Sequence, residues 1–242
     1  MLSPAALFLA LFTPFLQAAP SDDKAAEDAL ETFKTAIKAQ GESDRIEAVK
    51  TLAATVHLKT LSRLAAVISS SEGEKVRIAA IKGIALFEPF KKQVVTLLGS
   101  SFQAASKEPR VQASILQALG STGDPNALTC IHHAFEDKDG SVCRAAVAAA
   151  AELKNLSSID PLIALLAKSE KTFKANSGGA ITKQMPVGGQ SVNSAQSPDF
   201  MTNLKDTIDA SNKALQTLTG QEISKAAEWQ TWWNKNRATF KP

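Results

Sequence analysis

Three segments of the chain share one pattern of apolar residues, and this repetition limits the possible folds more than any other feature. The pattern starts at Val76, Val111 and Val142, so its copies lie 35 and 31 residues apart. Small and apolar residues follow each valine at helical spacing, as in KVRIAAIKGIALF from Lys75. A weaker copy, DRIEAVKTLAAT, starts at Asp44 and has the polar first positions expected of a terminal unit. Each copy predicts an amphipathic helix with one buried face.

A further amphipathic segment precedes each of these helices or follows the last one. The four segments cover residues 57–69, 89–105, 125–135 and 160–167. Prolines stand near three of their starts, where a missing N–H costs little, and Asp124 and Asp160 are predicted as N-caps. Each helix pair exposes an apolar face that only a neighbouring pair can cover, so the pairs must stack. Small residues such as Ala146 let the helices approach closely, and a large residue there would overpack the stack.

Two units show this arrangement most clearly: LKTLSRLAAVISSSEGEKVRIAAIKGIALF and GDPNALTCIHHAFEDKDGSVCRAAVAAAAEL. Helix, short acidic turn and V-x-x-A-A pattern together resemble the HEAT-repeat family over about residues 24–170. The resemblance implies an all-α fold, an α-solenoid of stacked antiparallel helix pairs, with residues 20–174 forming the repeats. Composition independently excludes an all-β fold, because Ala, Leu, Lys and Ser dominate and the chain has no Tyr.

Residues 1–19, MLSPAALFLALFTPFLQAA, predict a secretory signal peptide. An uncharged apolar centre leads to small residues at Ala18 and Ala19, before the polar sequence that follows Pro20. Neither Lys nor Arg precedes the apolar run, so a positive amino-terminal region is missing. An uncleaved membrane anchor is the alternative, which Pro4, Pro14 and the shortness of the run disfavour. We therefore expect an exported protein, periplasmic or extracellular, whose mature chain starts near Ala19 or Pro20.

Residues 175–198 contain four Gly, two Pro and many Ser, Gln and Asn, which predicts a flexible polar insertion inside a fifth helix pair. Two interpretations remain open: a segment without a role of its own, or a mobile peptide that contacts a partner. Helices are expected to resume over residues 199–242, with Gly220 as a helix stop.

The C-terminal segment contains all three tryptophans, Trp229, Trp232 and Trp233, on one side of a predicted helix. Its pattern, A-L-x-x-L-T-G followed by W-x-x-W-W-x-x-N, resembles the closing segment of some exported bacterial HEAT-repeat proteins. The cluster has two interpretations. It either seals the open end of the solenoid or forms an aromatic platform for a carbohydrate or cell-wall polymer, which requires at least two exposed, coplanar rings.

The sequence gives little support for catalysis, metal binding or nucleic-acid binding. Its formal net charge of +3 is too small for a nucleic-acid partner, and no nucleophile or phosphate-binding motif occurs. His132, His133 and Glu136 are close in sequence but supply no complete metal-ligand set, so we predict no metal and no cofactor. A pocket with perturbed titratable groups near these three residues would instead indicate an enzyme subunit. Cys130 and Cys143 either form a disulfide or are separately buried thiols.

The function that we expect is a non-catalytic, monomeric scaffold that binds another protein. The second helices of such a stack line its inner face, and their polar positions are the candidate partner-binding residues: Arg77, Lys82, Gln112, Gln117 and Arg144. This surface is mildly basic and would suit an acidic partner. No membrane contact is expected beyond the signal peptide or anchor.

Overall fold

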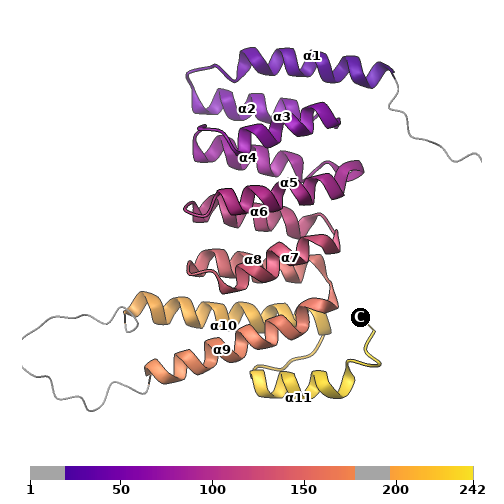
Figure 1. Ribbon diagram of the computed structural model, residues 1–242. Coiled ribbons are helices and arrows are strands. Elements are labelled where there is room, and N and C mark those ends of the chain that lie inside the picture. The colour runs from indigo at the N-terminus through magenta and orange to yellow at the C-terminus, as the bar shows by residue number, and fades with distance from the viewer. Residues whose placement is uncertain (1–19, 178–196, 242) are drawn as a thin grey trace, which may run out of the picture.

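The computed structural model describes residues 20–177 and 197–241, and every regular element in these ranges is a helix. The helices stack one above another from α1 to α11 in two layers (Figure 1). The A layer contains the first helix of each pair: α1 (Pro20–Ala36), α3 (Leu58–Ile68), α5 (Lys91–Ala104), α7 (Leu128–His133), α9 (Ile159–Ser177) and the terminal α11 (Ala226–Asn236). The B layer contains the second helices: α2 (Glu42–Ala53), α4 (Glu74–Ile84), α6 (Pro109–Ser121), α8 (Gly140–Leu153) and α10 (Pro198–Thr219). The fold is an α-solenoid, as the sequence predicted.

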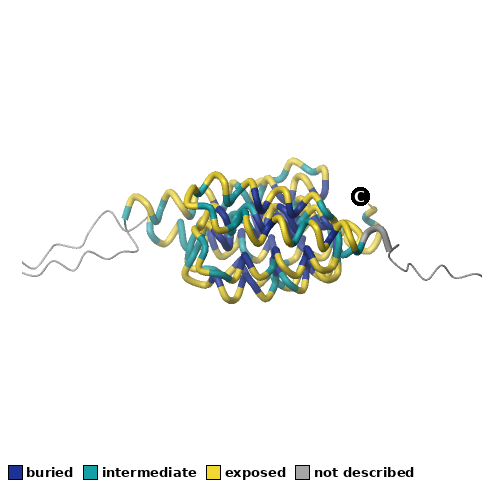
Figure 2. Tube along the Cα trace, turned by 90° about the horizontal axis from the view of Figure 1, so that it is seen from above, coloured by how far each residue is buried: buried dark blue, intermediate teal, exposed yellow. Residues whose placement is uncertain are grey.

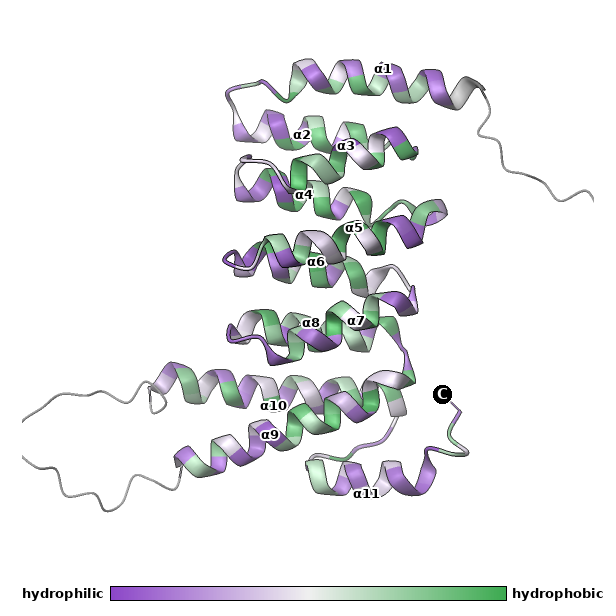
Figure 3. Cartoon of the chain, viewed as in Figure 1, coloured by the Kyte–Doolittle hydropathy of each residue, from purple (hydrophilic) through white to green (hydrophobic). Residues whose placement is uncertain are grey.

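The repeated valines mark the buried face of the B helices. Val76, Val111 and Val142 are all fully buried at the starts of α4, α6 and α8. Viewed along the stack, buried residues occupy the middle and exposed residues the outside (Figure 2). Apolar and polar residues accordingly alternate around most helices (Figure 3). The helical period of the sequence thus places one continuous core between the A and B layers.

Two glycines set how closely neighbouring B helices approach. A Cβ atom on Gly83 would lie 2.7 Å from the Cβ of Ala53, so α4 is packed directly against α2. A Cβ atom on Gly120 would lie 2.8 Å from the Cα of Ala149, so α6 rests on the main chain of α8. The close packing of the B layer therefore depends on glycine at these two positions.

Short 3-10 helices begin or end several A helices: η1 (Glu88–Phe90), η2 (Pro125–Ala127), η3 (Ala134–Glu136) and η4 (Leu156–Ser158). Asp124 caps η2 as predicted, because its Oδ1 accepts a hydrogen bond from Asn126 N at 2.9 Å. The prediction for Asp160 is wrong, since this residue lies inside the first turn of α9. Asn155 takes the capping role instead, accepting a hydrogen bond from Ser157 N at 2.9 Å.

The fifth pair consists of α9 and α10, which pack on each other, while α10 also packs on α8. Helix α9 continues to Ser177, three residues into the segment predicted to be a loop. Residues 178–196 of the predicted insertion, and residues 1–19 of the predicted signal peptide, lie outside the described residues. Gly220 ends α10 with a φ of 69°, the left-handed conformation that glycine adopts readily. Among the helices of the described ranges, none is long and apolar enough to cross a membrane.

Candidate partner-binding face

The side chain of the residue after each repeated valine donates a hydrogen bond to a main-chain carbonyl at or near the end of the preceding A helix. Arg77 Nε donates to Ile68 O at 2.7 Å, and Gln112 Nε2 donates to Phe102 O at 3.4 Å. At the same position of the next unit, Cys143 Sγ donates to the carbonyl of the preceding A segment at 3.3 Å. These bonds supply partners for carbonyl groups that a helix end leaves unpaired.

This finding corrects the prediction for two of the five candidate partner-binding residues. Only 13% of the Arg77 side chain is exposed, and its Nη1 also pairs with Glu108 at the start of α6. Gln112 is buried, with 4% exposure. Arg77 and Gln112 therefore connect helices within the stack and do not offer free polar groups to a partner.

The other three candidates lie at or near the surface of the B layer. Lys82 of α4 and Gln117 of α6 are exposed. Arg144 of α8 is half-buried and donates from Nη1 to Asn203 Oδ1 of α10 at 2.9 Å. Lys82 and Gln117 are thus free to contact another molecule, whereas Arg144 joins two neighbouring B helices.

A groove with a volume of about 500 Å³ lies between α2 and α4, beside Lys82. It opens to solvent, because Lys82 and Leu86 in its lining are exposed, Leu86 to 68%. The lining is apolar apart from three lysines and consists of Ile46, Lys50, Ala53, Ala54, Lys75, Ile78, Ala79, Lys82, Gly83 and Leu86. The sequence reasoning singled out Lys82 but missed the groove, which arises where small residues of two helices face each other.

Three large apolar side chains are exposed among the described residues: Val56, Leu58 and Leu86. Leu86 follows the last turn of α4 and lines the groove, while Val56 and Leu58, 44% and 46% exposed, follow α2. Because α2 and α4 are equivalent helices of neighbouring pairs, their carboxyl ends lie at the same edge of the stack. An exposed leucine in the lining of an apolar groove is typical of an interaction surface.

The tryptophan cluster closes the last repeat. Trp229 and Trp233 are buried, and Trp232 is partly buried. Trp229 Nε1 donates to Asn212 Oδ1 of α10 at 3.0 Å, which fixes α11 against the fifth pair. The rings of Trp229 and Trp232 are perpendicular, with an interplanar angle of 87°, and those of Trp232 and Trp233 lie at 24°, but Trp229 and Trp233 are buried and leave no exposed pair. The geometry does not favour a carbohydrate platform, which needs two exposed, coplanar rings.

The histidines and cysteines near α7 have ordinary structural partners. His132 Nε2 lies 2.9 Å from Ser158 Oγ, the ring packs on Phe135, and burial lowers the pKa of His132 below its usual value. Cys130 and Cys143 are free thiols, so the structure does not contain the disulfide that the sequence left open. Burial raises the pKa of each thiol to about 11, which leaves it protonated and unreactive near neutral pH.

A pocket of about 230 Å³ does lie beside His132, Phe135 and Glu136. Groups of three or more potential metal ligands are absent from the described part of the chain. Within this pocket His132 contacts the Ser158 hydroxyl and the Phe135 ring.

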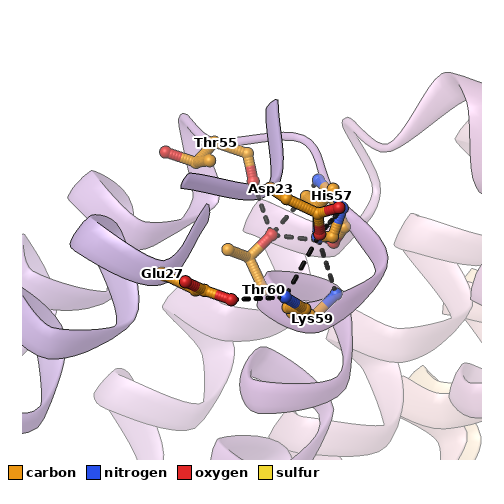
Figure 4. Close-up of polar contacts among 6 residues, drawn as sticks. All are labelled: Asp23, Glu27, Thr55, His57, Lys59 and Thr60. Atoms are coloured by element: carbon orange, nitrogen blue, oxygen red, sulfur yellow. Dashed lines mark hydrogen bonds and ion pairs between the residues drawn. The ribbon is translucent and has the colours of Figure 1, made fainter. Parts of the chain in front are cut away.

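At the N-terminal end of the stack, polar contacts join the first helix pair, α1–α2, to the second pair, α3–α4 (Figure 4). His57 caps α3, with Nδ1 accepting from Lys59 N at 3.1 Å and the main-chain N–H donating to Thr60 Oγ1 at 3.2 Å. Lys59 Nζ lies 2.8 Å from Glu27 Oε1 and 3.1 Å from Asp23 Oδ1, both on α1. Hydrogen bonds to Glu27 and then Asp23 raise the pKa of Lys59. These contacts are exposed and hold α1 in place without forming a site.

Comparison with known protein families agrees with this architecture. Residues 100–178, from the end of α5 through α9, match the family model described as HEAT repeats. Residues 100–178 thus carry HEAT repeats. The arrangement of paired helices continues outside the matched residues, because α2 and α4 form the same B layer as α6 and α8. No curated protein matches the chain. HEAT repeats commonly serve as scaffolds for protein interactions.

Proposed function

We propose that this HEAT-repeat protein is a non-catalytic scaffold that binds another protein through the exposed surface of its B helices, here called the B face. The groove between α2 and α4 carries this proposal, because it combines an open apolar lining with the exposed side chain of Leu86. A stack of paired helices offers such a surface along its whole length. The buried thiols and the hydrogen-bonded His132 add no reactive group to it.

Site-specific photo-crosslinking tests the face that binds. A benzophenone amino acid replaces Lys82 or Gln117 on the B face, or Gln93 on the A helix α5, in the full chain expressed in its host. All three residues are exposed, and Gln93 and Gln117 form a matched pair because both are helical glutamines. We expect covalent adducts from the two B-face positions only. Adducts from Gln93 alone, or equal adducts from all three positions, would contradict the proposal.

We also propose that the protein is exported, with residues 1–19 removed. The apolar run that ends in Ala18 and Ala19 supports this, together with the resemblance of the tryptophan-rich closing segment to exported bacterial HEAT-repeat proteins. Fractionation of the host and N-terminal sequencing of the purified chain test it. We expect a chain that starts near Ala19 or Pro20 outside the cytoplasm. An intact Met1 on cytoplasmic protein would show that the proposal is wrong.

A further inference from the structure

The groove between α2 and α4 has the length and the apolar lining needed to bind a short helix. At its bottom, Gly83 lies against the methyl group of Ala53, so the two helices touch there and small residues form the floor of the groove. The larger Ile78 and Leu86 also line it and provide apolar contact surface. The lining residues on this side run from Lys75 in α4 to Leu86 just beyond its end, which at about 1.5 Å per residue is roughly 16 Å, or about three helical turns. An apolar groove of this length fits one face of an amphipathic helix of about eleven residues.

The charges around the groove indicate which kind of helix from a partner protein it would bind. Its three charged lining residues are all lysines: Lys50, Lys75 and Lys82. Lys50 lies 3.4 Å from Glu47 and Lys75 lies 2.9 Å from Glu42, and these pairs are exposed and therefore weak. For Lys82 no ion pair occurs within residues 20–177 and 197–241. Carboxylates on the partner helix could thus pair with Lys82 directly. They could also replace the glutamates that now pair with Lys50 and Lys75.

We propose that the α2–α4 groove binds an acidic amphipathic helix of a partner protein, about three turns long, with its apolar face on Ile78 and Leu86 and its carboxylates at Lys82. The inference rests on the proposed scaffold function and specifies its partner. A second copy of this chain is the less suitable occupant. A symmetric pairing through this groove would bring the three lysines of each copy against those of the other, and like charges at an interface oppose association.

A synthetic peptide of defined chemistry tests the occupant. The probe is a fluorescein-labelled 16-residue peptide with leucine on one helical face and glutamate on the other. Two control peptides carry lysine in place of glutamate, or the same residues in scrambled order. Fluorescence anisotropy with the full chain measures binding. We expect the glutamate peptide to bind at least about tenfold more tightly than either control, and its affinity to fall as salt is added.

Substitutions in the groove locate the binding. Leu86→Glu removes an apolar contact, and we expect about tenfold weaker binding. Lys82→Glu reverses the one unpaired charge, and we expect roughly fivefold weaker binding. Gln117→Glu is the matched control for Leu86→Glu, because both add a single negative charge at an exposed position and Gln117 lies outside the groove. All three positions are exposed, so the variants should fold, which circular dichroism checks.

The outcomes separate this inference from the proposed function. If Gln117→Glu weakens binding as much as Lys82→Glu, the affinity of the peptide depends only on the overall charge of the protein, and the groove is not the binding site. If the peptide does not bind while Lys82 and Gln117 still crosslink to a protein, the scaffold function stands and the acidic helix is wrong. If sedimentation instead shows dimers that Leu86→Glu dissociates, a second copy occupies the groove, and the inference is overturned.

Discussion

The N-terminal and C-terminal halves of the stack use the same helix pairs but differ in how neighbouring B helices meet. In the first half, α1 buries Phe33 in the core and adds exposed ion pairs, and the groove between α2 and α4 opens to solvent. In the second half, α6 lies on the main chain of α8, α10 packs on both α8 and α9, and a buried tryptophan seals the end.

The difference shows that one repeat pattern can serve stability and binding in separate places. Where Gly120 meets the main chain of Ala149, α6 and α8 are in direct contact. Where Gly83 meets the methyl group of Ala53, an apolar groove lies beside the contact. Both halves bury large apolar side chains, such as Ile81 and Trp229, so we infer that the first half differs by its binding surface and not by a weaker core.

Removing the tryptophan ring that closes the C-terminal end of the stack should produce the largest loss of stability. Trp229 is fully buried and bonded to Asn212. We expect Trp229→Ala to lower the free energy of unfolding by about 3–5 kcal/mol, measured by guanidinium unfolding followed by circular dichroism. Trp232→Ala is the control and should cost less, because Trp232 is only partly buried. Equal losses for the two variants would mean that the cap does not depend on the buried ring.

The close approach of α6 and α8 predicts opposite effects for two glycine substitutions. Gly120→Ala would place a methyl group 2.8–3.0 Å from main-chain atoms of Ala149, and we expect about 1–3 kcal/mol of destabilisation. Gly99→Ala in α5 meets nothing within 4 Å and should stabilise its helix by about 0.5–1 kcal/mol. Chemical denaturation of both variants checks the pair. Stabilisation by Gly120→Ala would disprove the tight contact.

The bonds of Arg77 should matter in the first half, although less than the cap does in the second. Arg77→Met keeps the length of the side chain but leaves the Ile68 carbonyl and the Glu108 carboxylate without this partner. We expect a loss of about 1–3 kcal/mol in the free energy of unfolding. Lys82→Met, an exposed change on the same helix, should have almost no effect. If the two variants behaved alike, Arg77 would be a surface residue after all.

Lys59 should give the smallest effect. Its contacts with Glu27 and Asp23 are exposed, so Lys59→Met should lower the thermal midpoint slightly at low salt and hardly at all at ~1 M salt. Because the folded-state pKa of Lys59 is raised, its contribution is present below about pH 10.5 and is lost as the pH rises through that raised pKa. Thermal melts of wild type and variant at pH 8 and about pH 11.5 compare the two. A difference that grew with pH would contradict this assignment.

The repeated valines allowed the B helices to be predicted from sequence, because a buried stripe at helical spacing fixes the element and its inward face. The helices predicted from Lys75, Val111 and Val142 are found as α4, α6 and α8. The pair α9–α10 was predicted from apolar residues at helical spacing, and the helix stop at Gly220 from the ease with which glycine adopts the left-handed conformation.

Sequence reasoning failed where the outcome depends on a neighbouring helix. Arg77 and Gln112 were interpreted as polar positions of an open face, yet both reach back to the preceding A helix. Their position one residue after a buried valine could have signalled this, since it borders the core. The groove was missed because Ala53 and Gly83 lie 30 residues apart, and only the packing of α2 on α4 reveals the space between them.

Hydrogen–deuterium exchange of the full chain, with and without the acidic leucine–glutamate peptide, tests the division between the two halves most directly. We expect the peptide to slow exchange in α2 and α4 and to leave α8 and α10 unchanged. Protection by the peptide in the C-terminal half alone would contradict the account.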